Sequence, residues 1–154
     1  MEFSSDELAG IADLFGAVDR PTLRRACVEL AYKQGVDREP ASFDDAIDGA
    51  VDGYHLLEVE RDEGTLLVPG PVAFPELPEG ATDLPHILDV ESRAIDDDRL
   101  AGAAQERFRA DAAGAIEAGD RERIERLLDV SYELEVWAPV ELADARRRLD
   151  DALE

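Results

Sequence analysis

Hydrophobic residues recur at intervals of three and four through the first third of the chain, a pattern typical of amphipathic helices. Three such stretches follow one another, at residues 5–17, 20–35 and 43–54. Ser4 and Glu7 have capping-box spacing at the start of the first stretch. Asp19 is placed to cap the second, and we expect Ser42 to cap the third. The pattern predicts three short helices in succession.

The hydrophobic period then changes from that of a helix to that of a strand. Leu56–Glu60 and Thr65–Val68 are β-prone runs, and the segment between them ends in Gly64, a residue suited to a tight turn. Three helices followed by a hairpin is the element order of a winged helix-turn-helix. We therefore interpret residues 1–68 as a winged-helix-like unit, in which 43–54 would be the groove-reading helix.

Residues 69–95 form a proline-rich segment. Five of the eight prolines in the chain lie between positions 69 and 85, which argues against a helix and against most strand pairing there. Hydrophobic residues are interleaved with these prolines. We expect an extended strap that lies against the protein surface instead of swinging freely as a linker.

Helical spacing returns in residues 96–154. One long stretch ends at Gly119, Asp120 is placed to cap a second, and a third follows the break at Pro139. This region is predicted to be a helical hairpin or three-helix unit. The fold class expected for the whole chain is mainly α with a small β-hairpin, its three segments packed as one globular body.

Charge changes the picture of the environment. The formal net charge is -22, every basic residue except Lys33 is an arginine, and asparagine is absent. These features fit a protein from an organism that keeps molar salt inside its cells, where K⁺ and water solvate the acidic surface. At such ionic strength the Debye length falls to about 3 Å, so repulsion among the carboxylates is screened. The acids are spread evenly, which disfavours a DNA mimic or an acidic tail.

Several functional classes lack the residues that they require. A P-loop needs Gly-Lys followed by Ser or Thr, whereas Lys33 is followed by Gln34, and no serine lies in a nucleophile elbow. The single cysteine, Cys27, falls in an apolar helical stripe and is expected to be buried and inert. With no secretory signal and no long apolar run, we expect a cytoplasmic protein without membrane contact. We also expect no cofactor, and the sequence disfavours an enzyme.

Only one polar cluster suggests a metal site. Asp83, His86 and Asp89 place two carboxylates around an imidazole, which are ligands for a divalent cation. Zinc sites usually recruit more than one His or Cys, and in so acidic a chain a histidine between carboxylates is expected by chance. The metal site is therefore the weaker interpretation, and a histidine that caps or packs the strap is the stronger.

Charge placement also bears on DNA binding. Arg20, Arg24, Arg25 and Arg61 are the candidates for contacts with DNA phosphates. The 43–54 helix, however, carries four aspartates and no basic residue, so it would repel the polyanion and lacks side chains that read base edges. DNA is a possible but disfavoured partner.

A small aromatic group near the end of the chain is open to two interpretations. Tyr132, Val136 and Trp137 lie close together ahead of Pro139. They would either anchor a protein partner or complete the core against the strap, and the second is favoured because Trp and Tyr are usually largely buried in small domains.

Several segments of the chain are distinctive: Leu67–Phe74, Leu77–Ala81 and Asp83–Val90 in the centre, together with Asp6–Gly10 and Leu127–Tyr132. In these segments the chain resembles a family of small acidic proteins from halophilic archaea. The family has no assigned function, so the likeness implies a haloarchaeal cytoplasmic origin and transfers no catalytic or binding residue. The leading hypothesis is a non-enzymatic protein-interaction or regulatory module, with another copy of the chain or another protein as partner. The alternative is a winged-helix transcriptional regulator.

Overall fold

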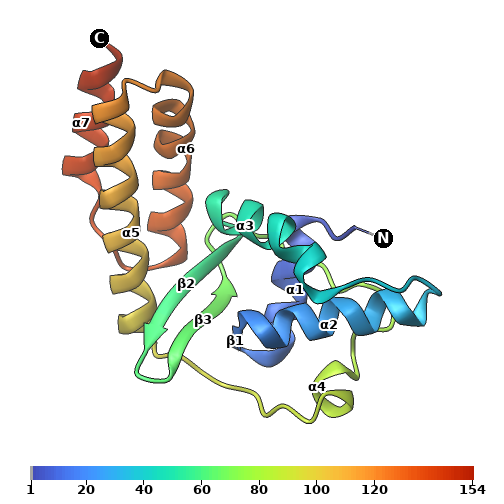
Figure 1. Ribbon diagram of the computed structural model, residues 1–154. Coiled ribbons are helices and arrows are strands. Elements are labelled where there is room, and N and C mark those ends of the chain that lie inside the picture. The colour runs from blue at the N-terminus through green and yellow to red at the C-terminus, as the bar shows by residue number, and fades with distance from the viewer. Residues whose placement is uncertain (1) are drawn as a thin grey trace. The chain divides into compact units, whose positions relative to one another are not determined.

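The computed structural model describes residues 2–154 and divides into two compact units, Met1–Ile95 and Asp96–Glu154 (Figure 1). The described chain is mainly helical, with one small antiparallel sheet in the first unit. The prediction of a mainly α fold with a small β element is confirmed.

The first two helices begin where their capping residues predict. α1 (Ser5–Phe15) starts with the capping box, in which the Ser4 hydroxyl accepts from the Glu7 amide and the Glu7 carboxylate accepts from the Ser4 amide. α2 (Arg20–Lys33) starts at Asp19, whose carboxylate accepts from the Thr22 amide at 2.8 Å. Each cap satisfies amide groups that have no partner within the helix.

The third helix begins differently from the prediction. α3 (Asp44–Asp52) follows directly from a short 3₁₀ turn, η1 (Pro40–Phe43), and has no side-chain cap. Ser42 lies inside that turn, where its hydroxyl donates to the carbonyl of Glu39 at 2.6 Å. Ser42 as the N-cap was therefore wrong, because the 3₁₀ turn takes up this residue before the helix begins.

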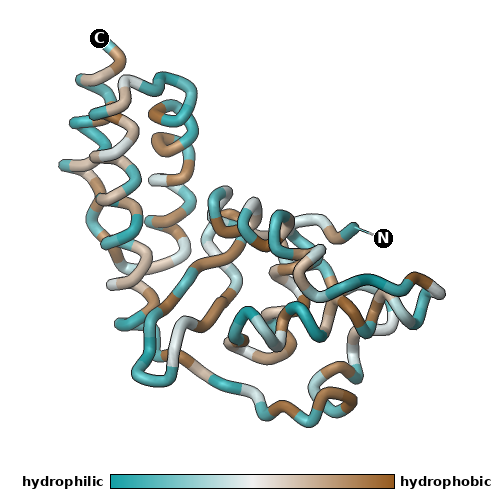
Figure 2. Tube along the Cα trace, in the orientation of Figure 1, coloured by the Kyte–Doolittle hydropathy of each residue, from teal (hydrophilic) through white to brown (hydrophobic). Residues whose placement is uncertain are grey.

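The sheet has three strands in the order β1-β3-β2. β2 (Leu56–Arg61) and β3 (Gly64–Pro69) form the predicted hairpin, with Arg61 opposite Gly64 and a φ of 129° at Gly64. Figure 2 shows hydrophilic residues at the hairpin tip and hydrophobic residues along its strands. β1 (Val18–Asp19) lies between α1 and α2 in the chain and pairs with β3. The sequence pattern did not indicate this strand.

The core of the first unit joins its helices to the sheet. The buried residues come from most of the circumference of α1, from one face of each of α2 and α3, and from the inner side of the hairpin. Those with no exposed surface include Phe15, Leu23, Leu30, Ile47 and Leu56.

The proline-rich segment lies against this unit along most of its length. Its backbone amides at Glu76 and Arg93 donate to the carbonyls of Asp6 and Phe15, at 3.0 and 2.8 Å. A side chain at Gly10 would overlap the carbonyl oxygen of Glu76, so α1 and the strap are in direct backbone contact at this point.

One part of the segment departs from the extended conformation that its prolines predict. A single helical turn, α4 (Leu84–Ile87), carries Pro85 near its start, where a missing amide donor removes no helical hydrogen bond. Leu84 is fully buried and joins the core of the first unit. This turn anchors the middle of the strap.

The second unit consists of α5 (Asp97–Ala118), α6 (Arg121–Trp137) and α7 (Ala143–Leu153), which all contact one another. Asp96 and Asp120 cap α5 and α6 as N-caps, and α5 ends at Gly119 in the left-handed conformation. Phe108, Ile124, Leu134 and Leu149 are among its buried residues. In the described chain, no helix combines the length and the apolar character that a bilayer crossing requires.

Candidate functional site

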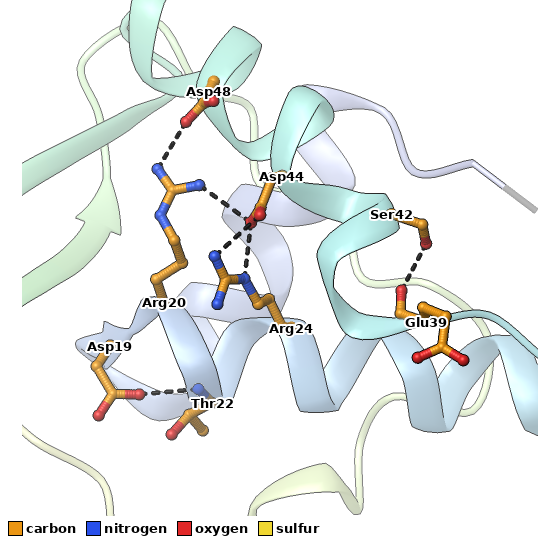
Figure 3. A network of polar contacts seen from close by, with 8 residues as sticks. All are labelled: Asp19, Arg20, Thr22, Arg24, Glu39, Ser42, Asp44 and Asp48. Carbon is orange, nitrogen blue, oxygen red and sulfur yellow. Dashed lines mark hydrogen bonds and ion pairs between the residues drawn. The ribbon is translucent and has the colours of Figure 1, made fainter.

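An ion-pair network joins α2 and α3 in the first unit (Figure 3). Arg24 holds Asp44 with two hydrogen bonds, from Nε to Oδ1 at 2.7 Å and from an Nη to Oδ2 at 2.9 Å. Arg20 donates to Asp48 at 2.8 Å and reaches Asp44 at 3.4 Å. Both arginines lie four residues apart on α2, and both aspartates four residues apart on α3, so each pair shares one helix face. The two facing pairs join the helices.

The two-pronged contact between Arg24 and Asp44 belongs to the strong, charge-assisted hydrogen bonds in proteins, because guanidinium and carboxylate match in shape. The hydrogen bonds from Arg24, followed by the charge of Arg24 and the contact with Arg20, hold the pKa of the Asp44 carboxyl below its ordinary 3.8. Asp44 therefore stays ionised at neutral pH.

The four arginines that the sequence put forward as phosphate contacts do not form one surface. Arg20 and Arg24 are bound to α3, and Arg25 points to the strap, where it donates to the Leu88 carbonyl at 3.5 Å. Arg61 lies exposed at the end of β2. Three of the four thus hold parts of the first unit to one another.

α3 itself presents an acidic surface. Asp45, Asp48 and Asp52 are exposed, and Asp44 is half-buried beneath the two arginines. The helix contains no basic residue. Of these four carboxylates, Asp45 and Asp52 have no ion pair with any described residue, so they are available to a partner.

The three candidate metal ligands are placed around α4. Asp83 precedes this turn, His86 lies within it, and Asp89 follows it with a φ of 54°, and all three are exposed. Across residues 2–154 no three His, Cys, Asp or Glu side chains are grouped so as to hold a metal ion. A single helical turn does not bring Asp83, His86 and Asp89 to a common centre.

The other histidine takes part in fastening the strap. His55 follows α3, and its Nε2 lies 3.9 Å from a carboxylate oxygen of Asp6. That same oxygen accepts a hydrogen bond from the amide of Phe74 at 3.0 Å. The His55 backbone carbonyl accepts from Gly70 at 2.9 Å. His55 thus sits where α1, α3 and the start of the strap meet.

Two further expectations had opposite outcomes. Cys27 is fully buried, and burial raises the pKa of its thiol to about 12, as expected for an inert core cysteine. The favoured burial of the aromatic group was wrong for Tyr132, which is 58% exposed, and for Val136, which is 89% exposed, whereas Trp137 is half-buried. Tyr132 instead stacks beneath Arg146, whose guanidinium lies 4.2 Å from the ring centre.

Fold and site together define a mainly helical protein with a small antiparallel sheet and an acidic third helix tied to the second by arginines. The model of a family of unknown function, DUF7109, matches residues 6–154, and the chain belongs to this family. No curated protein and no solved structure matches it.

Proposed function

We propose that the protein is a non-enzymatic interaction or regulatory module whose first unit is winged-helix-like and contacts another protein. The order α1-β1-α2-α3-β2-β3, with β3 between β1 and β2, supports the winged-helix-like interpretation. Folds of this kind serve many functions, so the surface of the unit, and not its topology, has to carry the functional argument.

The observation that carries the proposal is the charge of α3. In a winged helix-turn-helix this helix would enter the major groove, where Arg, Lys, Asn and Gln read base edges. Here Asp45 and Asp52 face solvent, and the neighbouring Arg20 and Arg24 are bound to Asp44 and Asp48. Such a surface offers DNA no side chain that reads base edges, and it matches a basic patch on a protein, because ion pairs buried in an interface are screened by salt much less than exposed charges.

The alternative, a DNA-binding transcriptional regulator, rests on the same element order. It requires Arg20, Arg24, Arg25 and Arg61 to reach phosphates together. Freeing the first two would break the bonds with Asp44 and Asp48 and leave those carboxylates beside the DNA backbone. The alternative is therefore disfavoured.

Charge reversal on α3 tests the proposal. The tagged chain is expressed in the organism that carries its gene, and lysate is captured in molar KCl after nuclease treatment. Asp45→Lys and Asp52→Lys together change the exposed face of α3 and leave the arginine network intact. Glu122→Lys and Glu125→Lys, on exposed positions of α6, are the matched control.

The proposal predicts a protein captured in stoichiometric amount, retained by the control variant and lost with the α3 variant. Capture of nuclease-sensitive material alone contradicts the proposal. Capture of a protein in the same amount by the α3 variant as by the wild-type chain also contradicts it.

We also propose that the protein works in the cytoplasm of a salt-in organism, supported by the net charge of -22. Screening of carboxylate repulsion then has to stabilise the fold. The midpoint of thermal unfolding is expected to rise between 0.1 and 2 M KCl, concentrations of the order at which screening becomes complete. An unchanged or falling midpoint contradicts the salt-adaptation part of the proposal.

A further inference from the structure

The first unit contains a cleft of about 650 Å³, within the range of small-molecule sites in proteins. Three segments that are distant in sequence line it: the start of α2, the β2–β3 turn, and the end of the strap at Arg93 and Ala94. Pro21 and Leu66 give it an apolar wall. Ligand sites usually combine such a wall with a few converging polar groups.

Arginines are concentrated in this cleft although the chain as a whole carries a net charge of -22. Arg61 and Arg93 line it, and within residues 2–154 neither side chain has an ion-pair partner. Arg20 also lines it but is bound to Asp44 and Asp48. Arg61 and Arg93, from separate segments, thus line one cleft without an ion-pair partner among the described residues.

Two acids also line the cleft and oppose an anion to different degrees. The Asp19 carboxylate is occupied as the N-cap of α2, where it accepts from the Thr22 amide at 2.8 Å. Glu63 lies in the exposed turn of the hairpin. Counted over its whole lining, the cleft has three arginines and two carboxylates, a small excess of positive charge in an acidic chain.

We propose that this cleft binds a small phosphate-bearing molecule, with Arg61 and Arg93 as its phosphate contacts. Guanidinium groups bind phosphate through paired hydrogen bonds, and two of them match the double charge of a phosphate monoester. The organic part of the ligand would lie against Pro21 and Leu66. This inference is independent of the protein-interaction proposal.

A small ligand suits the site better than a DNA backbone phosphate. A duplex lying over the hairpin would bring many phosphates close to the exposed acidic residues of its turn, Asp62 and Glu63. A single phosphate group inside the cleft meets mainly its lining, because screening limits the reach of the more distant acids.

Binding is tested with the full chain by calorimetric titration of ribose 5-phosphate and inorganic pyrophosphate, at the lowest KCl concentration that preserves the circular dichroism spectrum. Ribose and citrate control for the sugar and for carboxylate charge. Arg61→Gln and Arg93→Gln remove one guanidinium each. Arg126→Gln makes the same change at an exposed position in the second unit.

We expect saturable binding of both phosphate compounds, weakened at least about tenfold by Arg61→Gln and by Arg93→Gln and unchanged by Arg126→Gln. Ribose is expected not to bind, and citrate to bind more weakly. Failure of both phosphate compounds to saturate, equal weakening by Arg126→Gln, or equal binding of citrate overturns the assignment. Binding of a 20-base-pair duplex through Arg61 and Arg93, without binding of the small phosphates, would assign the cleft to DNA instead.

Discussion

Gly10→Ala tests the packing of the strap against α1. The added methyl group has two opposing effects on the free energy of unfolding, a gain in helix propensity and a clash with the strap. In a helix interior, replacing glycine by alanine stabilises the helix by about 1 kcal/mol. At Gly10 the added methyl group would overlap the carbonyl oxygen of Glu76, which belongs to the strap backbone and has no rotamer to escape into. The strap must move, which strains the hydrogen bond from the Glu76 amide to the Asp6 carbonyl, 3.0 Å long.

The size of the effect follows from these two terms. Forcing an extra methyl group into packed structure costs about 1–3 kcal/mol, which exceeds the helical gain of about 1 kcal/mol. We expect Gly10→Ala to lower the free energy of unfolding by up to about 2 kcal/mol. Gly49→Ala, in α3 with no atom near the added methyl group, is the matched control and should raise it by up to about 1 kcal/mol.

The assay is urea unfolding at constant KCl, followed by circular dichroism, together with hydrogen exchange of the strap amides. Gly10→Ala should also speed exchange at Glu76 and Phe74, whose amides are bound to Asp6. If Gly10→Ala stabilises the protein as much as Gly49→Ala does, and exchange is unchanged, the strap does not lie on α1 as described.

The remaining predictions concern single side chains of the first unit. Leu84→Ala should lower the free energy of unfolding by about 2–5 kcal/mol in the same urea assay, because Leu84 is fully buried. Ile87→Ala, at a site 42% exposed, should change the free energy of unfolding little. Equal losses for the two variants would contradict the anchoring of the strap by α4. The Asp44 carboxyl should titrate below 3.8 by carbon-detected NMR. Because the pKa of this group is lower in the folded state, its contribution to stability is present above the unfolded pKa and is lost as pH falls through the folded pKa. Arg24→Gln should shift the Asp44 titration upward, and an unshifted curve would contradict the network. Cys27, with a thiol pKa of about 12, should react with iodoacetamide at pH 8 only after unfolding, and rapid alkylation of the native protein would contradict its burial.

Features determined by nearby residues were predictable from the sequence. The capping box at Ser4 and Glu7 and the helix end at Gly119 depend on neighbours within a few positions, and both are present. The Ser42 cap failed because a 3₁₀ turn competed for the same residue. β1 was missed because two residues carry no period, and Val18–Asp19 becomes a strand only through its pairing with β3.

Features that depend on contacts between elements were not predictable. The sequence identified Arg20 and Arg24 as phosphate candidates and the aspartates of α3 as a repulsive face. It did not reveal that these groups bind each other, because that depends on how α2 and α3 pack. Arg93 carried no signal at all, since it becomes part of a cleft only when the strap returns to the start of α2.

The most direct test of the central claim, that the acidic α3 and its bound arginines exclude DNA, is fluorescence anisotropy of a labelled duplex titrated with the wild-type chain. The titration is repeated across a series of KCl concentrations at which the protein stays folded. We predict no binding at micromolar protein, the concentration at which non-specific DNA binders with dissociation constants of about 10⁻⁶ M respond. Binding that weakens steadily with salt and is lost in Arg20→Gln would contradict the account, because it would require Arg20 to leave Asp44 and Asp48 for phosphate.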